Sequence, residues 1–253
     1  MDILYVVGKG FSKCKNNELR YSLRSIEKYG KNIDKVYVSG YCPEFLSENV
    51  IKINYEQPYV SGKILPIIAK HANILATLLY AIDNSDISDE FLISMDDHIY
   101  ISPVDFGNYP FYMKQTVVLP QVGLTTYNKF LSHTRQFLIS QGLSYYNFCP
   151  HRNMHVSKSV IKEIRDTLNT IVNKPIPLES LAYIQNYRYT VYHDFKPVII
   201  KDVKIKTDDE LYKANTKITD VISTSDFTES SKINKFLDNL FKDKCKYEIW
   251  YEC

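Results

Sequence analysis

The sequence lacks the features that mark several large classes of protein. Its five cysteines are widely spaced and include no C-x-x-C pair, which argues against a disulfide framework or a structural zinc site and favours a reducing cytoplasm. No stretch approaches the roughly 20 apolar residues that a membrane-spanning helix needs, so we expect no membrane partner. Residues 1–8 lack the basic start and long apolar core of a signal peptide and are expected to form a first strand.

The chain also has almost no net charge. Its 31 basic and 29 acidic residues leave a formal charge of +2, from which no global field for nucleic acid follows. Phosphate binding depends on where lysine and arginine lie, so a local basic patch is compatible with this balance. Hydrophobic residues make up 45%, which is ordinary for a globular protein, and 253 residues suit one large α/β domain.

The first half alternates between apolar runs and helical periodicity. The expected elements are strands at 3–8, 35–39, 50–53 and 91–95, and helices at 17–30 and 67–83. This order, with short connections, predicts a mainly parallel, doubly wound sheet with helices on its faces. Ligands bind at the carboxyl ends of the strands in such sheets, so we expect the loop after Gly8 to contact a nucleotide.

The second half is less regular. The expected elements are strands at 117–119 and 197–205 and helices at 126–141, 157–172, 178–187 and 230–242. We find no internal repeat and no low-complexity linker, so residues 1–253 are interpreted as a single domain.

Asp96, Asp97 and His98 form the sharpest motif, because they follow directly on the apolar run 91–95. Burying charge at the end of a strand costs free energy unless a cation or hydrogen bonds compensate for it. Mg²⁺ and Mn²⁺ favour carboxylate oxygens, and Mn²⁺ also accepts imidazole. The motif therefore indicates a metal site that would neutralise a bound diphosphate. The alternative is an ordinary turn in which the acids cap the following element.

Two histidines and two arginines are further candidates. His151 and His155 follow Pro150, and either would serve as a metal ligand or a donor to phosphate, or else as an ordinary loop histidine. Arg20 and Arg24 lie one helical turn apart after the first loop, where a guanidinium suits a pyrophosphate. Charges on a solvated helix surface are the ordinary interpretation of the arginine pair.

Lys70 and Asn73 open the next helix and have the same two interpretations, phosphate contact or helix surface. Glu179 is a candidate base for an attacking hydroxyl, although a first-turn helix acid is the commoner role. Asp194 and Asp202 are equally open as the base.

Basic residues dominate the C-terminal fifth of the chain. They suit a phosphate backbone or, more commonly, a solvated helix face. They are Lys201, Lys204, Lys206, Lys232, Lys235, Lys242, Lys244 and Lys246.

Four segments, in the same order along the chain, resemble a family of phage-encoded glycosyltransferases that act on hydroxymethylcytosine or its glucosylated form. They are NELRYSLRSIEK at 17–28, FLISMDDH at 91–98, STSD at 223–226 and the closing segment at 236–248. Two departures stand out. Met95 replaces an asparagine of the family's Asn-Asp-Asp-His, and Phe148-Cys149-Pro150 stands where the family often has His-x-Pro. A ligand lost there would have to come from Cys149, His151 or His155.

The resemblance implies a GT-A-like fold, a UDP-sugar donor, Mn²⁺ or Mg²⁺, and DNA containing hydroxymethylcytosine or its glycosylated form as acceptor. It implies that Asp97 is the main metal ligand and that Asp96 binds the donor or the metal, with His98 close to the reaction. It further implies a nucleotide-sugar-binding half at 1–105 and an acceptor-binding half at 106–253 that ends in a basic helix. Glucose or arabinose would be transferred, in the cytoplasm of the host if the chain is phage-encoded.

Three other functions remain open. The same fold could serve a capsule or lipopolysaccharide acceptor. The acids and His98 could belong to a metal-dependent phosphoesterase, although such enzymes usually need further Asp and His clusters for two metals. A non-enzymatic nucleic-acid-binding protein would use the basic tail alone.

Overall fold

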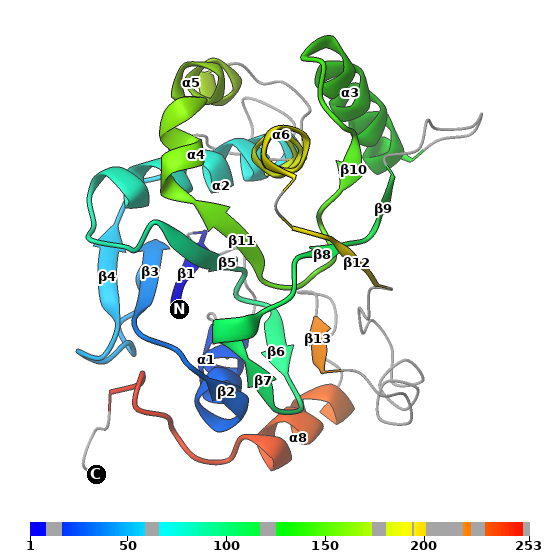
Figure 1. The fold of residues 1–253 in the computed structure, drawn as a ribbon. Coiled ribbons are helices and arrows are strands. Elements are labelled where there is room, and N and C mark those ends of the chain that lie inside the picture. Colours follow the sequence, from blue (N-terminus) through cyan, green and yellow to red (C-terminus); the bar gives the residue numbers. More distant parts are fainter. Residues whose placement is uncertain are drawn as a thin grey trace.

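A five-stranded sheet forms the centre of the molecule, with strand order β11-β5-β1-β3-β4 (Figure 1). The computed structural model describes residues 1–8, 17–58, 66–116, 125–173, 181–193, 195–200, 220–223 and 231–249. The strands are β1 (Asp2–Val7), β3 (Val36–Gly40), β4 (Ile51–Asn54), β5 (Glu90–Ser94) and β11 (Met154–Ser157). All are parallel except β11, which pairs antiparallel with β5. The expected fold class, a mainly parallel α/β sheet flanked by helices, is confirmed.

Every residue of β1 is buried, as a strand with helices on both faces requires. Ile3, Tyr5 and Val7 point to one face, which is covered by helix α1 (Asn17–Tyr29). Leu4 and Val6 point to the other face, which is covered by helix α2 (Pro66–Asp83). The side-chain period of two along a strand therefore divides the apolar core into two layers.

Both helices match the periodicity of the sequence. In α1 the helical repeat buries Leu19, Leu23 and Ile26 completely. In α2 the expected inward face is confirmed, because Leu78 and Ile82 are buried and Ile74 packs against the same core. Helix α1 connects β1 to β3, whereas α2 carries the chain back across β1 to β5. The chain thus reverses its direction of travel along the sheet between β1 and β5.

The remaining elements surround this sheet. The short strands are β2 (Gly30–Lys31), β6 (His98–Tyr100), β7 (Val104–Asp105), β8 (Tyr112–Met113), β9 (Gln115–Thr116), β10 (Tyr146–Asn147), β12 (Val198–Ile199) and β13 (Val221–Ser223). The helices are η1 (Phe106–Asn108), α3 (Thr126–Ser140), α4 (Lys158–Glu163), α5 (Arg165–Asn173), α6 (Ala182–Tyr192) and α8 (Ser231–Leu240). Across the described ranges, no helix has both the length and the apolar character needed to cross a bilayer.

Two expectations need correction. The single helix expected at 157–172 is two helices, α4 and α5, that meet at Ile164. Ile164 is itself buried, and the break falls at a position that carries no Gly or Pro signal in the sequence. The segment expected to be a loop around His155 contains strand β11. The strand expected at 117–119 lies outside the described residues, and only β12 is described within 197–205.

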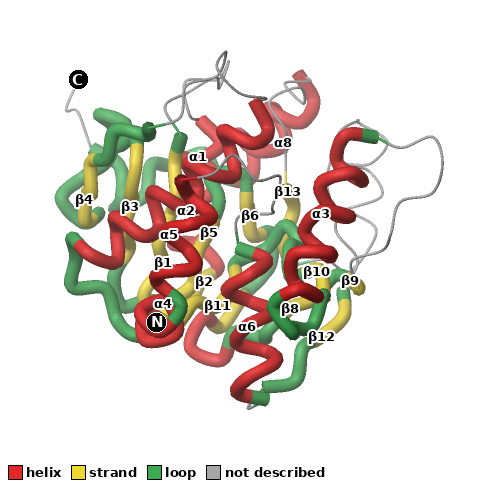
Figure 2. Tube along the Cα trace, turned by 90° about the horizontal axis from the view of Figure 1, so that it is seen from above, coloured by secondary structure: helices red, strands yellow, loops and turns green. Residues whose placement is uncertain are grey.

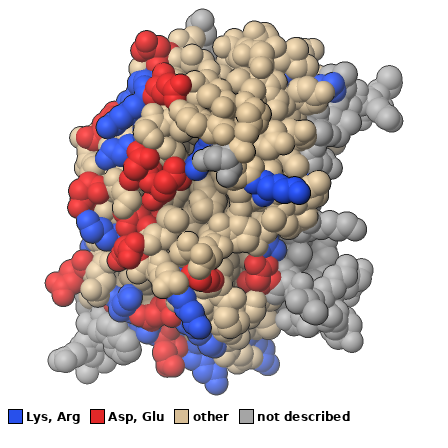
Figure 3. All heavy atoms as spheres, in the orientation of Figure 1, with Lys and Arg blue, Asp and Glu red and all other residues tan. Residues whose placement is uncertain are grey.

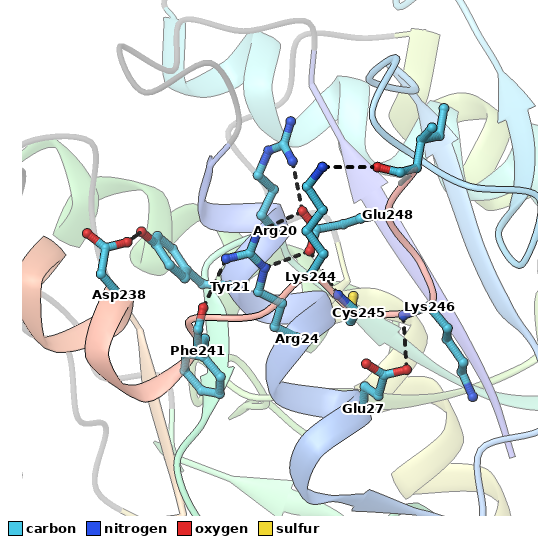
Figure 4. A network of polar contacts seen from close by, with 11 residues as sticks. Arg20, Tyr21, Arg24, Glu27, Asp238, Phe241, Lys244, Cys245, Lys246 and Glu248 are labelled. Carbon is cyan, nitrogen blue, oxygen red and sulfur yellow. Dashed lines mark hydrogen bonds and ion pairs between the residues drawn. The ribbon is translucent and has the colours of Figure 1, made fainter. Parts of the chain in front are cut away.

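The C-terminal segment, residues 241–249, folds back onto the start of the chain (Figure 4). Helix α8 lies beside α1 in both views of the backbone (Figure 1; Figure 2), and its Leu237 joins an apolar cluster with Tyr21 of α1. Beyond α8, Glu248 and Leu46 form an antiparallel bridge, and the backbone N of Ile249 donates to the carbonyl of Phe45 at 2.8 Å.

Glu248 joins this segment to α1 through two arginines (Figure 4). Its side chain is 0% exposed and accepts hydrogen bonds from Arg20 Nη1 at 2.7 Å and from Arg24 Nε at 2.6 Å and Nη2 at 2.9 Å. Arg24 Nη1 also donates to the carbonyl of Phe241, just after α8, at 3.0 Å. Burial alone would raise the pKa of Glu248, but the hydrogen bonds and charges of Arg24 and Arg20 outweigh it and hold the pKa below its ordinary value.

We expect Glu248→Gln to lower the free energy of unfolding by about 3 kcal/mol at pH 7, because removing one partner of a buried ion pair leaves uncompensated charge. A group with a lowered folded pKa stabilises the fold above its ordinary pKa, and this contribution is lost as pH falls through the folded value. Urea titrations should therefore show that the free energies of unfolding of the two proteins converge as the pH is lowered. Glu44→Gln, on an exposed residue, is the control and should stay within about 0.5 kcal/mol of wild type. Equal stability of wild type and Glu248→Gln at pH 7 would contradict this account.

Candidate functional site

The candidate site lies where the chain reverses, at the carboxyl ends of β1 and β5. In doubly wound sheets this reversal opens a crevice in which ligands bind. Gly8 follows the end of β1, and Asp96 and Asp97 follow the end of β5. Phe91 to Ile93 are completely buried, whereas both aspartates are partly exposed. The acids therefore emerge just beyond the buried strand, after Met95, which is itself partly exposed.

A tight turn leads from β5 into β6. The backbone N of His98 donates to the carbonyl of Met95 at 3.3 Å. Helix α1 holds the far side of the turn, because Ser22 donates its hydroxyl proton to the carbonyl of His98 and Ser25 accepts from the backbone N of Tyr100 at 3.0 Å. Both serines are completely buried. The helix that follows β1 thus fixes the position of the motif that follows β5.

Asp97 and His98 form a close pair. Asp97 Oδ1 lies 3.9 Å from His98 Nε2, and the two side chains are 24% and 3% exposed. Burial lowers the pKa of His98 to about 4, although the nearby charge of Asp97 acts in the opposite direction. The imidazole is therefore neutral at pH 7.

Asn153, just before β11, and Ser223, in β13, add buried polar groups beside His98. Asn153 Oδ1 lies 3.4 Å from His98 Nδ1 and 3.0 Å from Ser94 Oγ. Ser223 lies directly opposite His98 in the pairing of β13 with β6. Asn153 Nδ2 and Ser223 Oγ are buried and have no hydrogen-bond partner in the part of the chain that the structure describes. Asn153 was missed at the level of sequence, and Ser223 was noted there only as part of STSD.

The structure places the two candidate histidines differently. His151, partly exposed with φ of +50°, lies near enough to His98 to influence its pKa. His155 Nε2 is 2.7 Å from the carbonyl oxygen of Tyr109, and its ring stacks on Phe111. His155 pairs with Leu92, four residues before Asp96, which is about 13 Å along the strand. The structure therefore brings His151, but not His155, towards the acidic motif.

The fit of these residues to a metal ion is partial. Among the described residues, no group of three or more His, Cys, Asp or Glu side chains gathers closely enough to hold a metal ion. Asp97 suits an open site, in which Mg²⁺ or Mn²⁺ takes one or two carboxylates and completes its shell with water and substrate phosphates. The chain thus offers a charged anchor at this edge and no closed cage within the described residues.

The residues expected to contact the donor lie around the same edge of the sheet, but their surroundings differ. Arg24 and Arg20 are directed to Glu248, and the guanidinium of Arg20 lies 3.8 Å from the ring centre of Phe45. On α2, Lys70 is exposed and Asn73 partly exposed. The exposed Gly8 would, with a Cβ, meet Gln57 Oε1 at 3.6 Å. The three candidate bases, Glu179, Asp194 and Asp202, lie outside the described residues.

Gly40 shapes the neighbouring part of the edge, at the end of β3. It has φ of +97°, and a Cβ there would come within 2.2 Å of the carbonyl oxygen of Val7. The same oxygen accepts from the backbone N of Tyr41 at 2.9 Å, and the carbonyl of Gly40 accepts from Tyr55 at 3.1 Å. The ends of β1, β3 and β4 are therefore joined at a position that only glycine fits without strain.

Comparisons with known proteins return distant likenesses. No family model matches the chain, and no curated protein matches it in sequence. Among solved structures it is similar to the apo form of mouse xyloside xylosyltransferase 1, at 8% identity and a TM-score of 0.43, with 91% of this chain and 100% of that chain covered. It is also similar to an active-site mutant of LgtC, at 12% identity and a TM-score of 0.47, with 97% and 98% covered. At these values neither likeness bears on the reaction of this chain.

We expect Gly40→Ala to lower the free energy of unfolding by about 3 kcal/mol, from the positive φ and the forced shift of the β1 backbone. Gly142→Ala is the matched control, because Gly142 also has a positive φ, of +68°, but a Cβ there would meet nothing within 4 Å. It should cost only about 1 kcal/mol. Equal losses in thermal or urea unfolding would show that the close approach to Val7 does not matter.

Proposed function

We propose that this chain is a glycosyltransferase of the GT-A type that takes its sugar from a UDP-sugar. The observation that carries the proposal is the position of Asp96 and Asp97 at the carboxyl end of β5, beside the end of β1, where the sheet reverses. Paired acids at this place suit a nucleotide diphosphate held through a divalent cation. Residues 1–105 would bind the nucleotide sugar and residues 106–253 the acceptor.

Asp97 is the proposed anchor of Mn²⁺ or Mg²⁺, since its carboxylate is partly exposed just beyond the carboxyl end of β5. The cation, when bound, would neutralise charge on the departing diphosphate. Asp96 is proposed to bind the sugar or ribose of the donor, or the cation. Helix α1 contributes by holding the turn rigid through Ser22, because small displacements of positioned groups cost catalysis heavily.

The proposed acceptor is DNA containing hydroxymethylcytosine, or the sugar already attached to it. The resemblance of four ordered segments to phage DNA glycosyltransferases supports this acceptor, and such a reaction would take place in the cytoplasm. On the face drawn in Figure 3, the Lys and Arg side chains of the described residues are interspersed with Asp and Glu side chains. Lys235 and Lys242, on and just after α8, are exposed and suit phosphate contacts. Glu179, Asp194 or Asp202 would supply the base.

Mass spectrometry of nucleosides from hydroxymethylated DNA, after incubation with a panel of UDP-sugars and Mn²⁺, tests donor and acceptor together. We expect a gain of one hexose or pentose on hydroxymethylcytosine. Transfer only to saccharide acceptors would indicate the capsule or lipopolysaccharide type. Release of phosphate from a simple ester, without any sugar transfer, would indicate a phosphoesterase.

Asp97→Asn should lower kcat/KM at least about 100-fold, because it removes the charged anchor of the cation, an interaction worth several kcal/mol in the transition state. Its melting temperature should stay close to that of wild type, since Asp97 is partly exposed. The control is Asp166→Asn, an exposed acid in the first turn of α5, which should keep full activity. Unchanged sugar transfer by Asp97→Asn would remove the acidic motif from the mechanism.

A further inference from the structure

The imidazole of His98 is enclosed by polar atoms that the proposed reaction leaves unused. Its Nδ1 lies 3.4 Å from Asn153 Oδ1 and 3.5 Å from the backbone N of Met95, while its Nε2 faces Asp97. His98, Asn153 and Ser94 are each at most 2% exposed. Because bulk water hardly reaches them, these groups must satisfy one another.

The backbone decides which ring nitrogen carries the proton. The N–H of Met95 lies 3.5 Å from Nδ1 of His98 and can only donate, so this contact favours Nδ1 as the acceptor. In a neutral imidazole the proton then sits on Nε2. This nitrogen is the one that faces the carboxylate of Asp97, 3.9 Å away.

The amide of Asn153 supports the same tautomer when its NH₂ group faces His98. The two ends of an asparagine amide are nearly equal in size, so the surrounding space accepts either orientation. With NH₂ turned inward, Asn153 donates to Nδ1 and to Ser94 Oγ, and Ser94 donates to the carbonyl of Met95, 3.2 Å away. In the opposite orientation the buried NH₂ has no partner among the described residues, whereas with NH₂ inward the amide oxygen takes that place; an orphaned buried N–H group is the rarer of the two.

We propose that Asn153 and the backbone N–H of Met95 hold His98 as the Nε2–H tautomer, and that this N–H is a fixed donor that orients the carboxylate of Asp97. Asn153 is then a positioning residue that acts through His98. Because Asp97 is partly exposed, rotation of its side chain can bring its carboxylate from 3.9 Å into hydrogen-bond distance. The inference that His98 orients Asp97 for a ligand rests on the proposed function. The inference about the tautomer is independent of it.

Long-range ¹H–¹⁵N correlation NMR of ¹⁵N-histidine-labelled protein at pH 7 reads the tautomer directly. His98→Gln identifies the signals of His98 among the six histidines. We expect the Nε2–H pattern in the wild-type protein. An Nδ1–H pattern, or averaged shifts that show both tautomers in exchange, would overturn the proposal. The NMR sample contains no donor, metal or acceptor. A failed sugar-transfer assay would therefore not affect the assignment of the tautomer.

Asn153→Asp gives a second reading, because a carboxylate only accepts and draws a proton onto Nδ1. We expect the ¹⁵N shifts of His98 to move to the Nδ1–H or doubly protonated pattern. Asn186→Asp is the matched control, an equally buried amide in α6 bonded to Ser144 and Tyr146, and should leave the His98 signals unchanged. If Asn153→Asp folds and His98 keeps its wild-type shifts, Asn153 does not set the tautomer. If it does not fold, the wild-type spectrum still decides.

Discussion

The structure depends on one constraint, which is that β5 has a neighbouring strand on each edge and a packed layer on each face. Such a strand tolerates no charge along its buried length, because each unpaired charge would lose its hydration. Phe91, Leu92 and Ile93 satisfy this rule, and the acids flank this buried length, with Glu90 exposed before it and Asp96 and Asp97 partly exposed after it. The same sheet reverses its connection order beside β5, so the position that permits charge is also the position at which doubly wound sheets bind their ligands. Packing therefore confines the charge of this motif to the edge at which the proposed function needs it.

Helix α1 links this edge to the C-terminal segment. On one side, Ser22 and Ser25 bind the backbone of β6 and hold the turn that carries His98. On another side, Arg20 and Arg24 bind the buried carboxylate of Glu248. A carboxylate at this depth is stable only because two guanidiniums share its charge. The arginines that sequence patterning suggests for a donor pyrophosphate thus already have an anionic partner within the chain, and they contribute to the site through the position of α1.

The parallel half of the fold could be predicted from sequence because its signals are local. Continuous apolar runs mark strands that are buried on both faces, and the spacing of Leu19, Leu23 and Ile26 marks α1. The features that the sequence did not predict depend instead on contacts between residues far apart in the chain. Strand β11 is read as a loop because its pattern is weak and its partner lies some sixty residues earlier in the chain. The pairing of Glu248 with Arg24 spans 224 positions, and no periodicity encodes such a contact. Asn153 was missed for the same reason, since its role appears only when β11 lies beside β5.

The chemistry of the edge follows from how its charge is distributed. If His98 carried a proton on Nδ1, the lone pair of Nε2 would face the carboxylate of Asp97, and the two would repel unless a cation lay between them. With the proton on Nε2, the same contact is attractive without any ligand, and the exposed side of Asp97 stays open to a cation. The backbone N–H of Met95 favours the second arrangement, and it does so without adding charge to the site. The buried side of the motif is then balanced by neutral donors, and its exposed side is left for the cation that the proposed function requires.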